Sequence, residues 1–411
     1  MIDYYETKVH PITKRMVLDA FKQIRNNGQA AGVDGVSLKE YEKDLPQNLY
    51  KLWNRLTSGS YYPATAREKK IPKKGGGFRS LGICNVEDRV AQQVVRKRIE
   101  YKIDPTFHPD SYGYRPGRHA HHAIEMATQR CLKDNWVLDL DIKSFFDTID
   151  HELLMKAIKR YTNERWVLMY IERWLKAGIL REDGAIEYNS EGTMQGSVIS
   201  PLLANVFMHF VLDKWMEKNY PKVSFERYCD DVIVHCKSSQ QAISIKSNLR
   251  ARLKACKLDL NEEKTRIVFC KKQTNKSFKS DCHSSFDFLG YTFKPKLIPT
   301  KKGILLLTLP SMSQKSKNGV MEKLREMKIY KRKDTIQDLA RDVNSKMRGW
   351  ISYYGAFNKW GMGAICWNAN RILMKWVKRK RGWNSTRSIK WLKNVFKDHP
   401  NLFTHWKFSR P

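Results

Sequence analysis

Two adjacent aspartates, Asp230 and Asp231, stand inside the run Phe225-Glu-Arg-Tyr-Cys-Asp-Asp-Val-Ile-Val-His235. Short apolar, β-prone stretches flank them, a pattern that predicts a hairpin with the acids at its turn. Like charges this close repel each other. A divalent cation relieves the repulsion, because hard cations such as Mg²⁺ bind carboxylate oxygens together with phosphate oxygens. The pair therefore indicates phosphoryl-transfer chemistry.

A second acidic segment supports this interpretation. Residues 136–142 alternate as a strand, which places Asp139 and Asp141 on one face. Two-metal phosphoryl transfer needs carboxylates that span two cations about 4 Å apart, one activating a 3′-hydroxyl and one holding a triphosphate. A strand bearing Asp141 that faces the Asp230-Asp231 hairpin would supply them.

Several elements around these acids are also predicted. Asp150 is expected to cap a helix that begins after the acidic strand, and the run Lys73-Lys-Gly-Gly-Gly77 predicts a hairpin tip. Apolar spacing predicts a helix over 334–354. Further helices are expected over 311–328, 361–380 and 386–397.

Composition narrows the class of partner. The chain has 411 residues, is 41% hydrophobic and carries a formal charge of +34. Such a charge favours a polyanion, with nucleic acid as the default and a membrane surface as the weaker alternative. We expect no membrane insertion, because no apolar run approaches the roughly 20 residues that spanning requires. The N-terminus lacks an apolar signal core, so a cytoplasmic location is expected.

The eight cysteines are scattered without a Cys-x-x-Cys pair, which argues against both a zinc module and a disulfide framework. Charge concentrates from Lys301 to Pro411, where 26 Lys and Arg stand against 6 Asp and Glu. Seven of the twelve tryptophans lie there as well. Basic residues among aromatics fit a surface that binds RNA, although most of these tryptophans are expected to anchor a helical core.

Eight segments in order resemble the blocks of a group II intron reverse transcriptase/maturase of the bacterial type. They are Ala31-Gly-Val-Asp-Gly35, Ile71-Pro-Lys-Lys-Gly-Gly-Gly-Phe-Arg-Ser-Leu-Gly-Ile83, Ser111-Tyr-Gly-Tyr-Arg-Pro-Gly-Arg118, Asp141-Ile-Lys-Ser-Phe-Phe-Asp147, Gly192-Thr-Met-Gln-Gly-Ser-Val-Ile-Ser-Pro-Leu-Leu-Ala-Asn205, Tyr228-Cys-Asp-Asp231, Asn261-Glu-Glu-Lys-Thr265 and Phe288-Leu-Gly-Tyr291. Met347-Arg-Gly-Trp-Ile-Ser-Tyr-Tyr354 and Leu402-Phe-Thr-His-Trp406 are similar to the maturase-specific thumb. Any one block is weak, whereas eight in order are a specific signal.

The resemblance implies roles for individual residues. Asp141, Asp230 and Asp231 correspond to the three catalytic, metal-binding carboxylates, and Asp139 is expected to be structural. Lys264 corresponds to a lysine proposed as proton donor to pyrophosphate, with a structural role as the alternative. Tyr228 would support the primer terminus or simply pack the hairpin.

Five residues are implied to bind the nucleotide. Lys73 and Arg79 correspond to residues that clamp the triphosphate, a contact that suits Arg because its guanidinium binds phosphate in a bidentate manner; a solvated basic hairpin is the alternative. Phe145 corresponds to the steric gate against a ribose 2′-hydroxyl, with a core phenylalanine as the alternative and Phe146 assigned to the core. Gln195 and Gly196 correspond to the loop that lines the pocket.

The sequence departs from the family's usual pattern without losing a charge or a proposed metal ligand. The family commonly has Ala at Cys229, Pro at Met194, Gly at Ser144 and Ser197, and Pro at Ser80 and Cys84. Cys229 is expected to be a tolerated small residue rather than a reactive thiol. No Cys-x-x-Cys or His-rich nuclease segment follows the thumb-like part, so we expect the homing endonuclease of some relatives to be absent.

The expected fold is α+β, a right-hand polymerase whose fingers and palm contain antiparallel sheet, followed by an all-helical thumb/maturase domain. The expected boundaries are 1–135 for the N-terminal extension and fingers, 136–298 for the palm and 299–411 for the basic thumb. The expected cofactor is Mg²⁺, as two ions that Mn²⁺ could replace. A homodimer is left open.

The expected function is RNA-directed DNA synthesis together with splicing and retrohoming of a group II intron. The implied partners are the intron RNA, as template and splicing substrate, and a DNA primer or target, in the bacterial cytoplasm and nucleoid. Two alternatives stay open. One is a maturase whose polymerase activity is incidental or lost, and the other is a host-adapted reverse transcriptase that serves defence.

Overall fold

A computed structural model describes residues 10–26, 30–72, 77–270, 283–300 and 303–411. The chain divides into two compact units. The first comprises Met1–His119, Leu140–Val234 and Gln240–Thr265, and the second comprises Ala120–Asp139, His235–Ser239 and Arg266–Pro411. Helices and strands occur in both units, as expected for an α+β chain.

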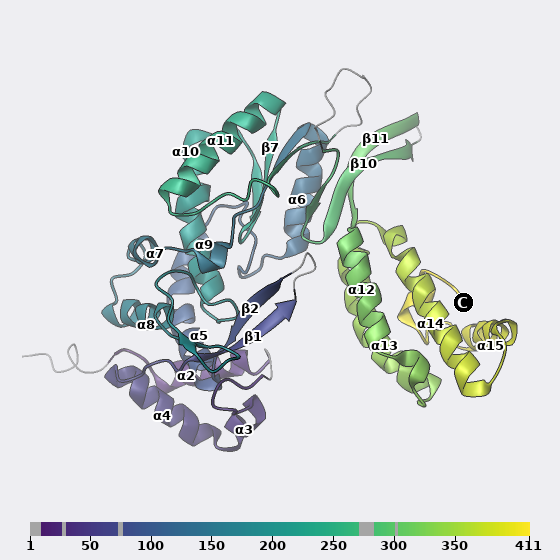
Figure 1. Ribbon diagram of the computed structural model, residues 1–411, viewed down its shortest axis with the longest axis horizontal. Helices are drawn as coiled ribbons and strands as arrows, with labels where there is room; N and C mark the ends of the chain where they lie inside the picture. The colour runs from purple at the N-terminus through teal and green to yellow at the C-terminus, as the bar shows by residue number, and fades with distance from the viewer. Residues whose placement is uncertain (1–9, 27–29, 73–76, 271–282, 301–302) are drawn as a thin grey trace, which may run out of the picture. The chain divides into compact units, whose positions relative to one another are not determined.

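The first unit alternates helices with short strands (Figure 1). Its elements are α2 (Lys14–Ile24), α3 (Leu38–Lys43), α4 (Leu45–Ser58), β1 (Ala66–Pro72), β2 (Phe78–Ile83), α5 (Val86–Ile103), η1 (Asp104–Thr106), η2 (Phe145–Asp147), α7 (His151–Ile158), α8 (Arg165–Leu175), β4 (Ile179–Leu180), β5 (Ile186–Glu187), α9 (Ser200–Met208), the π-helical turn η3 (His209–Asp213), α10 (Lys214–Asn219), β6 (Phe225–Tyr228), most of β7 (Asp231–Cys236) and most of α11 (Ser239–Ala255).

A four-stranded sheet, in the order β2-β1-β4-β5, lies within this unit. β1 and β2 pair antiparallel from Arg67↔Ile83 to Pro72↔Phe78, on either side of the predicted hairpin tip, whose residues 73–76 lie outside the described part of the chain. β4 pairs parallel with β1, and its other edge pairs antiparallel with β5. Asp150 caps α7 as predicted, because its carboxylate accepts the Leu153 N–H at 2.8 Å.

The second unit holds antiparallel strands and four of the predicted helices. Its elements are α6 (Ala120–Lys133), β3 (Trp136–Leu140, whose last residue belongs to the first unit), β8 (Arg266–Phe269), β9 (Phe286–Phe288), β10 (Tyr291–Thr300), β11 (Gly303–Met312), α12 (Gln314–Glu326), η4 (Ile329–Lys331), α13 (Ile336–Tyr354), η5 (Lys359–Met362), α14 (Gly363–Arg381), α15 (Ser385–Asp398) and η6 (Thr404–Lys407). The four helices expected between residues 311 and 397 are confirmed as α12 to α15.

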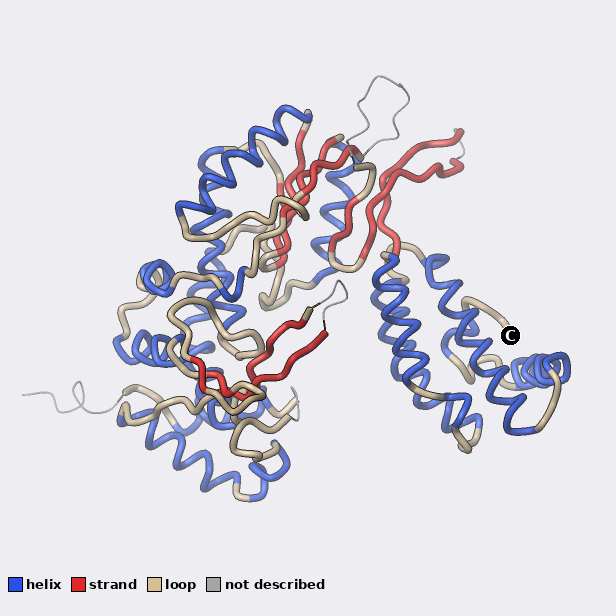
Figure 2. Tube along the Cα trace, viewed as in Figure 1, coloured by secondary structure: helices blue, strands red, loops and turns tan. Residues whose placement is uncertain are grey.

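β10 and β11 form a long antiparallel ribbon that leads directly into α12 (Figure 2). The expected palm–thumb boundary at residue 298 falls inside β10. α6, expected to belong to the N-terminal part, is grouped with the second unit. One contact within this unit is the His121 ring, which lies 2.9 Å from the Tyr353 carbonyl through Nε2 and stacks on the Tyr353 ring.

The C-terminal helices α12 to α15 are labelled in Figure 1, and their buried apolar side chains form one core. The predicted stripe of α13 is buried at Ile336, Leu339, Val343 and Met347. Trp376 and Trp406 belong to this core, which confirms their expected anchoring role, whereas Trp367 is 56% exposed.

His405 is completely buried in that core beside Trp406. Its Nε2 lies 2.9 Å from the Asn370 side-chain oxygen, which also accepts the Trp406 indole N–H. Burial lowers the pKa of His405 to about 4, from an ordinary value near 6.5. The folded chain therefore keeps this imidazole neutral at pH values where the unfolded chain protonates it.

We expect acid to destabilise the helical core through His405. Between pH 6.5 and pH 4 the unfolded state binds the extra proton, so stability is full above pH 6.5 and falls as the pH drops below it. The loss from pH 7 to pH 5 should be about 2 kcal/mol. Urea denaturation of the full chain, followed by tryptophan fluorescence, measures it. His405→Gln should lack this part of the pH dependence, and an equal slope in both proteins would contradict the assignment.

Candidate functional site

The aspartate hairpin forms as predicted. β6 and β7 are joined by the two-residue turn Cys229-Asp230, and Tyr228 pairs with Asp231 across it. Cys229 has a φ of +62°, in the left-handed region that two-residue hairpin turns use. Burial raises the pKa of the Cys229 thiol, and the Asp230 charge adds to the shift. Cys229 is therefore a buried thiol rather than a thiolate nucleophile, as expected from the sequence.

Asp141 follows β3 directly and is held by its backbone. Its N–H donates to the Thr265 hydroxyl at 3.2 Å, and its carbonyl accepts the Asn261 N–H at 2.8 Å. Lys264, on the same loop, places its Nζ 3.8 Å from an Asp141 carboxylate oxygen. The proposed proton donor thus lies beside a proposed metal ligand.

The charges of Asp141 and Arg79 both act on the Asp230 carboxyl. Burial raises the pKa of the Asp230 carboxyl, the Arg79 charge opposes that shift, and the Asp141 charge adds to it. Asp141, Asp230 and Arg79 are therefore close enough to interact electrostatically. A site that brings two carboxylates together against desolvation favours a cation between or beside them.

The carboxylates of Asp141 and Asp230 fit a Mg²⁺ ion that also binds substrate phosphates. Within the described residues, no three His, Cys, Asp or Glu side chains form a group that could hold a metal by themselves. Mg²⁺ is usually bound by one or two carboxylates plus substrate phosphates, rather than by a cage made of protein alone. Asp141 and Asp230 therefore fit an ion whose coordination the nucleotide completes, and Asp231, exposed at the start of β7, is the third candidate ligand.

A cavity of about 440 Å³ lies within the first unit, a volume in the range of small-molecule sites. Arg79 and Gln195, two of the five residues predicted to bind the nucleotide, line it. The other lining residues are Phe78, Ser80, Gly82, Phe146, Asp147, Ile179, Arg181, Glu187, Tyr188, Asn189, Ser190, Glu191, Gly192, Thr193 and Met194.

The two phenylalanines are placed the opposite way from the expectation. Phe145 is buried, with 2% of its surface exposed, whereas Phe146 lines the cavity. The reason is the preceding residue: Ser144 has a φ of +47° and enters the short helical turn η2, which directs Phe145 inward. The family's usual glycine at this position is explained by the same left-handed conformation, and it was the signal that could have located the turn.

Gln195 and Gly196 are held close to β2. The Gly82 N–H donates to the Gln195 carbonyl at 2.8 Å, and the Gln195 side chain donates to the Asp147 carboxylate at 3.1 Å. Gly196 has a φ of +100°, and a Cβ there would lie 2.8 Å from the Gly82 carbonyl oxygen. Glycine is required at this position on both counts.

Two predicted residues remain. Lys73 lies outside the described residues, so its predicted role stays a prediction. Tyr228 is partly buried, and its ring centroid lies 5.9 Å from that of Tyr114, which sequence analysis did not single out. Tyr114 has a φ of +56°, unusual for a residue with a bulky side chain.

Three of the departures from the family pattern form one cluster. The Cys84 sulfur lies 3.7 Å from the Met194 sulfur, and the Gln92 amide lies 3.8 Å from the Cys84 sulfur. The Ser197 hydroxyl donates to the same Gln92 side chain at 2.9 Å. These unusual residues therefore complement one another behind the loop that carries Gln195.

Comparison with known proteins agrees with the predicted class of polymerase. The chain belongs to the reverse transcriptase family, since residues 71–293 match the model described as reverse transcriptase (RNA-dependent DNA polymerase). Residues 317–395 match the maturase-specific domain of group II introns. The right-hand α+β fold with a helical C-terminal domain is thereby established.

Individual proteins similar to this chain include intron-encoded proteins. Protein YkfC of Escherichia coli is 32% identical over 274 residues, covering 57% of this chain and 71% of the relative. Group II intron-encoded protein LtrA of Lactococcus lactis is 31% identical over 269 residues, covering 63% of this chain and 44% of LtrA. The putative COX1/OXI3 intron 1 protein of Saccharomyces cerevisiae is 27% identical, and the match spans 35% of its length. The chain thus spans less than half of the latter two relatives.

Among solved structures, telomerase from Candida albicans in complex with a telomeric RNA fragment aligns with a TM-score of 0.45 at 11% identity, covering 90% of this chain and 68% of that one. A likeness this distant says nothing about activity. In the part of the chain that the structure describes, no helix has the length and apolar character needed to cross a bilayer.

Gly196→Ala should destabilise the protein more than the same substitution at an ordinary left-handed glycine. Gly117 is the matched control, because its φ is +69° and its Cβ would meet nothing within 4 Å. Gly117→Ala should cost about 1 kcal/mol of backbone strain. Gly196→Ala adds a clash with the Gly82 carbonyl and should cost about 2–4 kcal/mol. Thermal denaturation of both variants measures the difference, and equal losses would refute the close approach.

Proposed function

We propose that this reverse transcriptase copies the group II intron RNA whose splicing it assists, with Asp141, Asp230 and Asp231 as its catalytic carboxylates. The observation that carries the catalytic assignment is that Asp141 and Arg79 both act on the partly buried Asp230 carboxyl. A carboxylate pair beside a guanidinium suits a divalent ion that binds a triphosphate. Two Mg²⁺ ions, or Mn²⁺ in their place, would activate the primer 3′-hydroxyl and stabilise the leaving pyrophosphate.

The protein's own side chains have distinct tasks in this proposal. Arg79 lines the cavity from β2 and is placed to bind the triphosphate in a bidentate manner. Lys264 can give a proton to the departing pyrophosphate, since its ammonium lies beside Asp141. Gln195 and Gly196 shape the pocket wall through their contacts with Asp147 and Gly82. Lys73 and Tyr228 keep their proposed roles at the triphosphate and the primer.

The C-terminal helices are the proposed RNA-binding part. Their basic residues stand beside aromatic rings: the Arg371 guanidinium lies 4.9 Å from the exposed Trp367 ring, and the Arg387 guanidinium lies 4.4 Å from the Trp383 ring. Such pairs can stack on unpaired bases while other basic residues contact phosphates. Together with the maturase-specific match, this composition supports recognition of the intron RNA.

Splicing, retrohoming and a DNA primer or target site are part of the proposal, because the chain spans only part of LtrA. Nascent DNA strands at replication forks are one source of primer, which would place the protein in the bacterial cytoplasm and nucleoid. The two alternatives, a maturase with incidental polymerase activity and a host-adapted enzyme in defence, predict different results in the assays below.

Asp230→Asn should abolish DNA synthesis while leaving RNA binding intact. Extension of a DNA primer on an RNA template with Mg²⁺ should fall at least about 100-fold, because a metal ligand is lost. Asp183→Asn, in the exposed turn before β5, is the control. Splicing of the cognate intron at low Mg²⁺ gives the second readout.

Unchanged extension by Asp230→Asn would refute the catalytic assignment. Normal splicing by the same variant would show that polymerisation and splicing are separable. If the wild-type protein extends primers but never promotes splicing, the maturase half fails and the defence alternative is favoured.

Phe146, rather than Phe145, is the proposed sugar gate, because its ring lines the cavity. Phe146→Val should raise incorporation of ribonucleotides relative to deoxynucleotides by about tenfold or more, since the smaller side chain leaves room for a 2′-hydroxyl. Phe145→Leu should destabilise the fold without changing that ratio. Single-nucleotide extension with each triphosphate measures it, and a shift produced by Phe145→Leu alone would restore the expectation from the sequence.

A further inference from the structure

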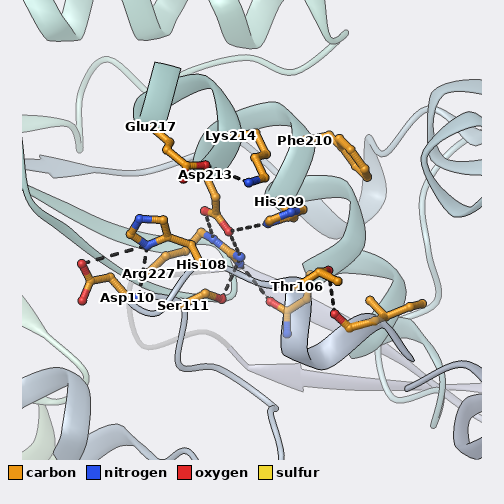
Figure 3. Close-up of polar contacts among 12 residues, drawn as sticks. Thr106, His108, Asp110, Ser111, His209, Phe210, Asp213, Lys214, Glu217 and Arg227 are labelled. Carbon is orange, nitrogen blue, oxygen red and sulfur yellow. Dashed lines mark hydrogen bonds and ion pairs between the residues drawn. The ribbon is translucent and has the colours of Figure 1, made fainter. Parts of the chain in front are cut away.

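A fully buried arginine, Arg227, binds the backbone of the Cys229-Asp230 turn, called the catalytic turn below. The Arg227 guanidinium is 0% exposed and uses all three nitrogens (Figure 3). Nε and Nη2 donate to the two Asp213 carboxylate oxygens at 2.7 and 2.6 Å. Nη1 donates to the Asn205 side-chain oxygen at 2.9 Å and to the Cys229 carbonyl at 3.1 Å, and Nη2 also donates to the Ser111 hydroxyl at 2.8 Å.

Stability alone does not explain this arrangement. Burial by itself would raise the pKa of Asp213, but Arg227 and His209 hold it below its ordinary value. Asp213 is therefore an ionised carboxylate at the end of the π-helical turn η3, and His209 lies 3.5 Å from it. Desolvation of a buried ion pair offsets most of its attraction. π-Helical turns occur frequently at functional sites.

The guanidinium connects two segments that meet at the turn. Asn205, which accepts from Arg227, donates to the Gly113 carbonyl at 2.7 Å. Gly113 lies so close to the hairpin that a Cβ there would be 2.6 Å from the Cys229 nitrogen. Backbone bonds continue the contact, since the Tyr112 N–H donates to the Arg227 carbonyl at 2.8 Å.

Each of the two segments continues into a residue of the candidate site. Asp230 follows Cys229 in the turn, and Tyr114 follows Gly113 in a left-handed conformation. The Tyr114 ring is 52% exposed and close enough to Asp230 and Arg79 for their charges to act on its hydroxyl. One buried group thus holds the backbone directly before two residues of the candidate site, Asp230 and Tyr114.

We propose that Arg227, with Asn205 and Asp213, is a positioning unit that holds the Cys229-Asp230 turn and the Gly113-Tyr114 segment in register. The unit touches no reactant and acts through the backbone of its neighbours. It rests on the proposed function, in which Asp230 binds metal. Loosening the turn should weaken metal binding and slow the chemical step, while leaving the affinity for the nucleotide largely unchanged.

The test is Arg227→Lys in the full chain. Lysine keeps a positive charge for Asp213, but its single nitrogen cannot occupy the three positions from which the guanidinium reaches Asp213, Asn205, Ser111 and the Cys229 carbonyl together. Mn²⁺ binding is measured by electron paramagnetic resonance, and kcat and KM by single-nucleotide extension. We expect the Mn²⁺ Kd to rise severalfold and kcat to fall about 10- to 100-fold, with KM for the nucleotide within about twofold.

Arg173→Lys is the matched control. Arg173 is partly buried and donates to the Gly59 carbonyl at 2.8 Å and to the Tyr61 carbonyl, and neither partner belongs to the catalytic turn or to the Gly113-Tyr114 segment. It should leave the Mn²⁺ Kd and kcat near the wild-type values. Equal losses in both variants, or none in Arg227→Lys, would overturn the proposal.

If Arg227→Lys does not fold, Asn205→Ala takes its place, because it leaves the Arg227–Asp213 pair intact. The same pattern is expected with smaller changes, and wild-type Mn²⁺ binding and kcat in a folded Asn205→Ala protein would overturn the proposal. A wild-type protein that fails to extend any primer would refute the proposed function instead. Mn²⁺ binding would still test the positioning unit.

Discussion

The proximity of Asp141 and Asp230 is the constraint on which the site depends. Burial and the Asp141 charge raise the pKa of the Asp230 carboxyl, and the Lys264 ammonium lies 3.8 Å from an Asp141 carboxylate oxygen. Such a pair is stable only where its backbone is held firmly. Asp141 is fixed by Thr265 and Asn261, and Asp230 by a turn whose carbonyl is bound from behind by Arg227. The backbone of both acids is therefore held in place by the protein's own contacts, without a cation.

Local patterns in the sequence were sufficient for the elements that carry the chemistry. The β6–β7 hairpin, the Asp150 cap and helix α13 follow from alternation, capping chemistry and apolar spacing within a few residues. The order of the family blocks then predicted roles for Asp141, Arg79 and Gln195, of which the last two line one cavity.

What the sequence could not provide was orientation and long-range contact. Phe145 and Phe146 are chemically alike, and their composition does not tell which one is buried and which one lines the cavity after the left-handed Ser144. The bond from Asn205 to Gly113 joins residues 92 positions apart. No periodicity encodes such a contact, because it arises from the packing of separate elements. The tryptophans show the same limit: Trp376 and Trp367 stand on one helix, yet one is buried and the other is exposed.

The sulfur contact between Cys84 and Met194 bears on how this chain can change during evolution. Both residues stand where the family commonly has proline. The Cys84 sulfur contacts the Met194 sulfur and the Gln92 amide, and the Ser197 hydroxyl donates to the same Gln92 side chain. A return of any one position to the common residue would meet partners adapted to the unusual one. The three positions are therefore expected to be epistatic: the effect of exchanging one of them depends on which residues stand at the other two.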